Sequence, residues 1–195
     1  MAINIQNQTP RLVFPFGISV SRGLVEDFSG IQKFGYNSSV GTSFETVWDG
    51  NNTYTYPSSA GTATATSSST DDNTGTVEIQ GLDSNYDLAT ETLTIGGSAG
   101  TTSFIRVFRA LMKTANTGNS NVGDISITVS STTVAKITAG YGQTFIAIYT
   151  IPRNKRSFIH QLVVGSSNEL GIEIRIIAKD ISNLNVWRTC DFITN

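Results

Sequence analysis

The sequence predicts an all-β fold: an antiparallel β-sandwich or jelly roll with an extended N-terminal arm. The composition, the alternation of apolar and polar residues after residue 76, and regularly spaced turn clusters lead to this prediction. Charged residues make up only 14% of the 195-residue chain, against about 25% in an average domain. Thr, Ser, Val and Ile are abundant, which favours strands over helices.

Alternation places the strands one after another along the chain. The expected strands are Thr76–Gln80, Leu88–Ile95, Phe104–Lys113, Asp124–Ser130, Val134–Ile137, Thr144–Ile151, Ser157–Val164, Leu170–Lys179 and Val186–Ile193. Residues 57–75 fit a long polar loop or a strand around Thr62–Ser68 equally well. About eight strands separated by turns indicate a sandwich or jelly roll.

The strand expected at Phe104–Lys113 is apolar on both faces. Strict alternation puts Phe104, Phe108, Ala110 and Met112 on one face, with Ile105, Val107 and Leu111 on the other. A strand of this kind lies in the centre of a sheet or at a contact between subunits.

We expect two regions, with residues 1–40 as an extended arm or edge segment and residues 41–195 as the β-sandwich domain. The arm carries the apolar residues Leu12, Val13, Phe14, Phe16, Ile18 and Val20. Pro10, Pro15 and Gly17 interrupt this run, which argues for extended chain. An arm this apolar needs a partner surface.

Charge and hydropathy exclude several classes of partner. The net charge is −2 and the basic residues are scattered, so we expect no nucleic-acid binding. No run of about 18 apolar residues predicts a membrane span, and the first residues lack the pattern of a signal peptide. A lone cysteine, Cys190, fits assembly in a reducing compartment, in the role of a structural thiol.

No catalytic residues, metal site or cofactor site are expected. His160 shares an apolar face with Phe158 and Leu162, so a packed core or interface histidine is favoured over a general base. Residues 83–87 place oxygen side chains where a calcium loop would, but Leu88 and Thr94 break the template. An Asx-stabilised hairpin turn explains this segment better. The pair Asp71 and Asp72 lies in a polar loop without a placeable partner.

Four aromatic residues lie near expected turns: Trp48, Tyr54, Tyr56 and Tyr141. Such residues stack on sugar rings in some proteins, but packing between subunits is their commoner use.

An ordered series of segments resembles a family of virion structural proteins of tailed phages, frequent in cyanobacterial and marine phages. The match covers about residues 31–165. It rests on residues 31–37 (IQKFGYN), 46–50 (TVWDG), 81–87 (GLDSNYD), 91–94 (ETLT), 104–110 (FIRVFRA), 121–125 (NVGDI) and 149–152 (YTIP). The resemblance implies a virion component without fixing its place on the particle.

The leading expectation from this resemblance is a capsid decoration or cement protein that bridges capsomers and stabilises the head. Its partners would be the major capsid protein, further copies of itself in a homotrimer, and other virion proteins, in a virion assembled in the host cytoplasm. The expected contact residues are Leu12, Val13, Phe14, Phe16, Ile18, Val20, Trp48, Phe104 and Phe108. The alternatives are a head-fibre, tail or baseplate protein that binds host glycans, and an enzyme such as a glycan depolymerase, for which we expect no activity.

Overall fold

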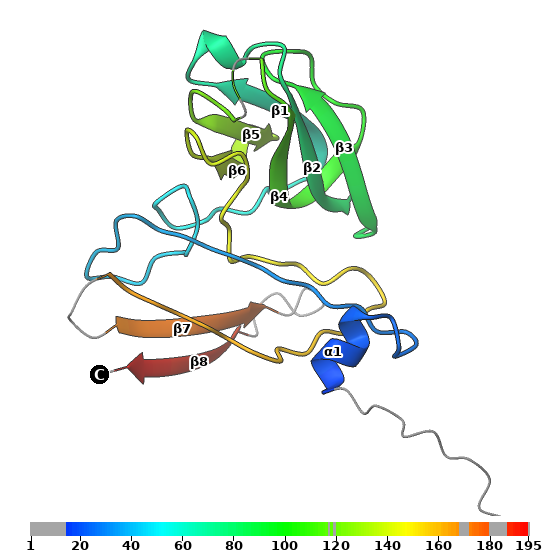
Figure 1. Ribbon diagram of the computed structural model, residues 1–195, viewed down its shortest axis with the longest axis vertical. Coiled ribbons are helices and arrows are strands. Elements are labelled where there is room, and N and C mark those ends of the chain that lie inside the picture. Colours follow the sequence, from blue (N-terminus) through cyan, green and yellow to red (C-terminus); the bar gives the residue numbers. More distant parts are fainter. Residues whose placement is uncertain (1–14, 117, 119, 168–171, 180–186, 195) are drawn as a thin grey trace, which may run out of the picture. The chain divides into compact units, whose positions relative to one another are not determined.

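The computed structural model describes residues 15–116, 118, 120–167, 172–179 and 187–194 (Figure 1). Its strands are β1 (Gly61–Ser67), β2 (Thr76–Asp83), β3 (Leu88–Thr94), β4 (Ser103–Thr114), β5 (Ile125–Val129), β6 (Thr132–Ile137), β7 (Ile172–Lys179) and β8 (Trp187–Thr194). Two short helices accompany them, α1 (Phe16–Ser21) and the 3₁₀ turn η1 (Thr70–Asp72). The all-β prediction is therefore confirmed. Within these ranges no helix has the length and apolar character of a membrane span.

The chain divides into two units, residues 1–32 and 33–195. In the first unit the structure corrects the expectation of extended chain, because residues 16–21 form α1. The carbonyl of Pro15 accepts hydrogen bonds from the amides of Ile18 and Ser19. A proline at a helix start is tolerated, since the first N–H groups have no partner within the helix. The prediction of extended chain was wrong here because Pro15 stands at the start of the helix and does not interrupt it.

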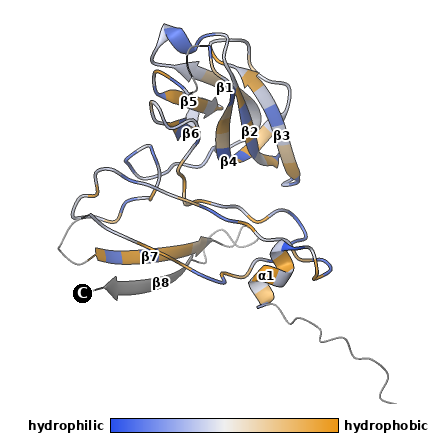
Figure 2. Ribbon diagram, viewed as in Figure 1, coloured by the Kyte–Doolittle hydropathy of each residue, from blue (hydrophilic) through white to orange (hydrophobic). Residues whose placement is uncertain are grey.

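In the second unit, six antiparallel strands form one sheet in the order β3-β2-β4-β1-β5-β6. One apolar cluster takes residues from all six strands. Its members are Ala63, Ala65, Val77, Ile79, Leu93, Ile95, Phe104, Val107, Ala110, Ile125, Ile127, Val129, Val134, Ala135 and Ile137. The alternating colours along the strands in Figure 2 reflect this one-sided burial. Strands β4 and β6 contact each other although β1 and β5 lie between them in the sheet order, so the sheet curls around its core. The expected stacking of two sheets is not confirmed.

Strand β4 contains β-bulges that change which residues face the core. Opposite β2, Gln80 pairs with Arg109 and Gly81 with Val107, so Phe108 is an extra residue. Ile105 is extra in the same way, between the partners of Leu82 and Asp83. A side chain at residue 81 would place its Cβ 2.0 Å from the carbonyl oxygen of Arg106. Glycine is therefore required where the bulged strand approaches β2.

The bulges correct the faces that strict alternation predicted for this strand. Phe104, Val107 and Ala110 belong to the main core, against which Met112 packs. The extra residues Ile105 and Phe108 form a second cluster with Leu82. Ala60, Tyr86 and Tyr149 pack against this second cluster. One strand thus contributes to two apolar clusters, which explains why it reads as apolar on both faces.

Strands β7 and β8 form a separate two-stranded antiparallel sheet, with Ile172 opposite Thr194 and Lys179 opposite Trp187. Figure 2 colours most of β7 as hydrophobic. Ile174 and Ile176 are half-buried, and Ile177 is 53% exposed. No third strand joins this sheet among the described residues. A two-stranded sheet is marginally stable in water unless more strands or a covering layer join it.

Two further expectations about strands are settled by the structure. Residues 61–67 form β1, so the strand reading of this segment is confirmed over the loop reading. Thr144–Ile151 and Ser157–Val164 were expected as strands and form none. The first makes a single isolated bridge, Ile146 with Trp48. The second finds no strand partner in the described part of the chain.

Polar side chains fasten the loops of the six-stranded body. The buried carboxylate of Asp72 accepts hydrogen bonds from the Ser67 hydroxyl at 2.5 Å and from the amides of Val122 and Gly123 at 2.7 and 2.8 Å. Burial opposes ionisation of Asp72, but these donors outweigh it and hold its pKa below the ordinary value.

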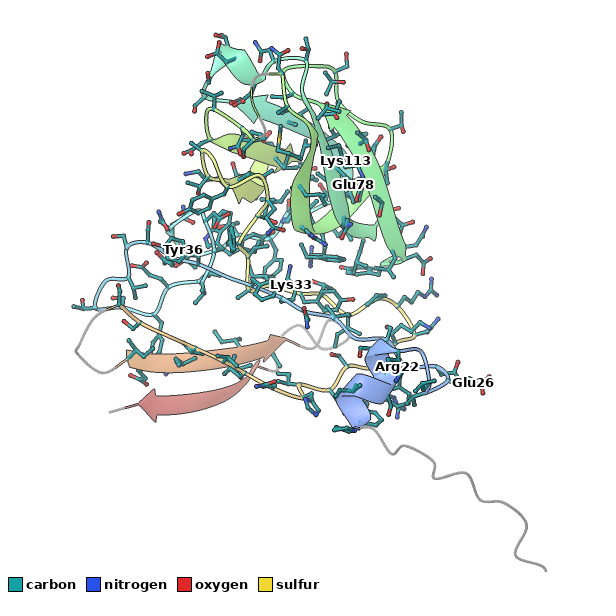
Figure 3. The ribbon with its side chains drawn as sticks, viewed as in Figure 1. Arg22, Glu26, Lys33, Tyr36, Glu78 and Lys113 are labelled. Atoms are coloured by element: carbon teal, nitrogen blue, oxygen red, sulfur yellow. The ribbon has the colours of Figure 1, made fainter. Side chains whose placement is uncertain are left out.

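A second charged contact lies on the surface of the same sheet. Glu78 on β2 and Lys113 on β4 point toward each other, with an N–O distance of 3.1 Å (Figure 3). Ion pairs of this exposed kind add little to stability. The body therefore owes its cohesion to the apolar core and to the buried hydrogen bonds of its loops.

Candidate functional site: an apolar interaction surface

Large apolar side chains are exposed mainly outside the six-stranded body. In the described part of the second unit they are Phe34, Tyr36, Val40, Phe44, Val47, Tyr56, Leu88, Val122, Tyr141, Ile151, Phe158, Ile159, Leu162, Val163, Val164 and Ile177. Most of them lie in two irregular stretches, residues 34–56 and 151–164. Contiguous exposed apolar groups mark interaction sites on soluble proteins. We refer to these two stretches as the flanking segments.

The flanking segments are tied to the body at their bases. The ring of Tyr149 lies 4.9 Å from the ring of Phe108. The amide of Arg153 donates to the carbonyl of Tyr86 at 2.9 Å. The amide of Ala147, which precedes the second segment, donates to the carbonyl of Val47 in the first segment at 2.9 Å. The body therefore presents both segments from fixed points.

Residues 157–164 are the most exposed apolar part of the flanking segments. Phe158 is 77% exposed, Ile159 70% and Val163 80%. In Figure 1 the segment is drawn as coil without an arrow. No hydrogen bond joins its backbone to the described residues. Neighbouring positions point to opposite faces of an extended chain, so both faces of this segment are apolar and uncovered.

An open hollow of about 380 Å³ lies between the start of the first flanking segment and residues 141–145. Its lining residues are Phe34, Gly35, Tyr36, Tyr141 and Phe145. Tyr141 and Phe145 pack edge to face with ring centroids 5.5 Å apart. The amide of Tyr36 donates to the carbonyl of Phe145 at 3.3 Å. A hollow of this aromatic character accepts an apolar side chain or the face of a sugar ring.

Lys33 fixes the start of the first flanking segment against β4 (Figure 3). Its ammonium group donates a hydrogen bond to the carbonyl of Phe108, an extra residue of the bulged strand. The same nitrogen lies 5.7 Å from the centroid of the Phe108 ring. Burial, with a smaller contribution from the charge of Arg109, lowers the pKa of Lys33 to about 8. Its contacts are those of an anchor, with a carbonyl and a ring face as its partners.

Asp49 is a buried carboxylate with one unsatisfied oxygen. The residue is 3% exposed. Oδ2 accepts a hydrogen bond from the amide of Phe145 at 2.8 Å, whereas Oδ1 has no partner in the described structure. Burial raises the pKa of Asp49 to about 6, opposed by the Phe145 amide and by Lys136, while Asp124 adds to the rise. The charged form of Asp49 is thus disfavoured where the first flanking segment contacts Phe145.

The structure places the predicted contact residues in several different environments. Leu12, Val13 and Phe14 lie outside the described residues. Phe16 and Ile18 are exposed on α1, and Val20 is half-buried there. Trp48, Phe104 and Phe108 are instead buried within their own chain, at 3%, 0% and 9% exposure. The expectation that these three residues contact a partner is corrected, because side chains that fill the chain's own apolar clusters offer no surface to a partner.

The aromatic set near the turns is also divided by the structure. Trp48 and Tyr54 are buried, and the Tyr54 hydroxyl donates to the carbonyl of Val134 at 2.9 Å. These two rings are therefore available neither for stacking on a sugar nor for packing against another subunit. Tyr56 and Tyr141 are exposed. Of the four residues, Tyr141 lines the aromatic hollow.

The remaining chemical candidates have structural partners or lie on the surface. His160 is exposed, which corrects the core reading, while the interface reading stays a prediction. Asp83 Oδ1 accepts from the amides of Asn85 and Asp87 at 2.8 and 3.0 Å, so the Asx turn is confirmed. Cys190 pairs with Ile176 in the β7–β8 register, and its side chain lies outside the described part. Among the described residues no group of three His, Cys, Asp or Glu side chains could hold a metal.

Comparison with known proteins gives no assignment: no family model, curated protein or solved structure matches the chain. The geometry of the flanking segments is therefore the basis for a functional proposal.

Sequence reasoning missed two features of this surface. Lys33 was not singled out, although a lone lysine in an apolar stretch is a recognisable signal. The exposure of residues 157–164 was also missed, because their alternation reads like that of any buried strand.

Proposed function

We propose that the chain is a structural subunit of a phage virion, a capsid decoration or cement protein that acts by binding other subunits. One observation carries this proposal. Apolar flanking segments project from a body whose own core is already filled. A chain built in this way gains stability when other subunits cover the segments.

The proposed mechanism is mass action on an assembled shell. A subunit that binds the assembled lattice and not its separated parts shifts the equilibrium toward the lattice. The curled six-stranded sheet would supply a rigid spacer, and the flanking segments would supply the grip across capsomers. The resemblance to phage virion proteins supports this assignment, and a homotrimer remains the expected assembly.

The direct test is to locate the chain on particles of the phage that encodes it. Mass spectrometry of purified particles should find the chain in a fixed ratio to the major capsid protein, and an image reconstruction should show its density at capsomer junctions. Absence of the chain from particles freed of host protein would refute the proposal.

The predicted role of the arm has its own test. A chain lacking residues 1–20 should fail to attach to shells, with an unchanged unfolding temperature. The body should stay intact because residues 1–32 form a separate unit. Full decoration of shells by the truncated chain would show that the arm does not provide the grip.

A second candidate function is attachment to host glycans. It is favoured by the aromatic hollow, where the exposed Tyr36 and Tyr141 present ring faces. Binding of the purified chain to host polysaccharide, lost in the Tyr141→Ala variant and kept in Tyr56→Ala, would support it. Binding to capsids without binding to host cells would favour the cement role.

A further inference from the structure

We infer that residues 157–164 pair with the β7–β8 sheet of a second copy of this chain, as the third strand of that sheet. The chain carries an extended segment without a strand partner and a two-stranded sheet without a third strand, both within the described residues. The inference deepens the proposed function, since it names the surface through which subunits would hold one another.

The properties of the segment identify the kind of partner that it needs. Phe158 and Leu162 point to one face of an extended chain, and Ile159 and Val163 to the other. Such a two-sided apolar pattern is typical of strands covered on both faces. Its backbone amides and carbonyls make no hydrogen bond to the described residues. A strand edge that also carries apolar cover satisfies both requirements, and this is the chemistry of β-strand addition.

The β7–β8 sheet matches the segment in length and in composition. The segment spans eight residues, and β7 and β8 have eight residues each. Strand β7 is rich in isoleucine, including the exposed Ile177. A two-stranded sheet becomes independently stable when a third strand joins it. One donor segment and one acceptor sheet per chain would let the copies close into a ring, as a heterologous interface can.

The test uses the purified full-length chain at rising concentration, with molar mass and hydrogen exchange measured on the same samples. We expect a self-associated species, and slowed exchange of the amides of residues 158–164 that appears together with it. Ile159→Pro and His160→Pro remove neighbouring amides, which point to opposite edges of a strand. One of the two variants should therefore weaken self-association about tenfold, the loss of roughly one hydrogen bond. The control Gln161→Ala keeps the backbone amides and should associate as the parent does.

Each other outcome would overturn the inference. A monomer with fast exchange at residues 158–164 at all concentrations would show that the segment needs a different partner. A monomer with slow exchange there would show that it pairs within its own chain. An oligomer with fast exchange there, or one unaffected by both proline substitutions, would place the contact elsewhere. Unfolding of the body at the parent's temperature would verify that the proline variants are folded.

Measuring whether the same protein decorates phage particles separates this inference from the proposed function. A monomeric chain that still decorates particles would refute strand exchange and leave the cement role standing. A chain whose copies pair through residues 157–164 but that is absent from particles would support the inference and refute the cement role.

Discussion

The six-stranded body and the flanking segments use the same apolar residue types with opposite results. In the body Phe104 is fully buried, whereas in the second flanking segment Phe158 is 77% exposed. Both lie in stretches whose alternation predicts a strand. The difference is that Phe104 has neighbouring strands in its own chain and Phe158 has none among the described residues. Alternation therefore indicates strand character, but it does not say which chain supplies the partner.

The largest expected effect is the difference in the free energy of unfolding between the same substitution made in the body and in a flanking segment. Phe104→Ala opens a cavity in the core and should lower the free energy of unfolding by about 3–5 kcal/mol. Phe158→Ala removes an exposed ring and should change the unfolding of the isolated body by less than about 0.5 kcal/mol. Chemical denaturation followed by tryptophan fluorescence measures both. Equal losses would mean that Phe158 is buried in the chain's own fold, and the comparison would fail.

A medium effect is expected from the carboxylate that fastens η1 to the loop before β5. Asp72→Ala leaves the amides of Val122 and Gly123 without their acceptor, so stability should fall by about 2–3 kcal/mol. The exposed neighbour Asp71 is the matched control, and Asp71→Ala should have little effect on the unfolding temperature.

The same carboxylate predicts a dependence on pH. Because the pKa of Asp72 is lowered on folding, its contribution is present above the ordinary value of 3.8. That contribution should be lost as the pH falls through the lowered pKa. Acid unfolding of the parent that coincides with that of Asp72→Ala would contradict this assignment.

The smallest effect should come from Asp49, which lies in the first flanking segment and accepts a hydrogen bond from the amide of Phe145. Its pKa is raised from 3.8 to about 6, so the folded state binds a proton that the unfolded state has already released. Stability should therefore fall as the pH rises from about 4 through 6. The two-unit difference sets a ceiling of about 3 kcal/mol.

Asp49→Asn removes the charge and should flatten this profile, with a gain of about 1 kcal/mol at neutral pH. Thermal unfolding between pH 4 and 8 measures the slope. Lys136 and Asp124 act on the same carboxyl, so Lys136→Met should steepen the profile. A parent whose stability rises over this range would show that Asp49 is stabilised in its charged form.

The sequence predicted the strands of the body well, because each of them buries one face against strands of the same chain. Asp124–Ser130 alternates cleanly, and β5 follows it within a residue or two at each end. Alternation failed at β4, where extra residues shift the face without any change in composition. A bulge depends on the pairing of two distant segments, so one strand read alone does not reveal it.

Less of the candidate site was predictable than of the fold. Trp48 was expected at the surface because it lies near an expected turn. Its indole instead donates to the carbonyl of Asn52 at 2.8 Å, and the side chain is buried beside Tyr54. The exposure of Phe158 was not predictable either, because a buried strand and an uncovered one have the same apolar pattern. Both properties depend on which segments meet in space.

The extra residue Phe108 of β4 has a consequence for how related chains could diverge. If Phe108 were deleted, Val107 and Arg109 would keep their partners Gly81 and Gln80, and the main core would keep its side chains. The loss would fall on Tyr149 and Lys33, which both contact Phe108. Single-residue insertions and deletions at this point could therefore reshape the attachment of the flanking segments during evolution, while the six-stranded body is inherited unchanged.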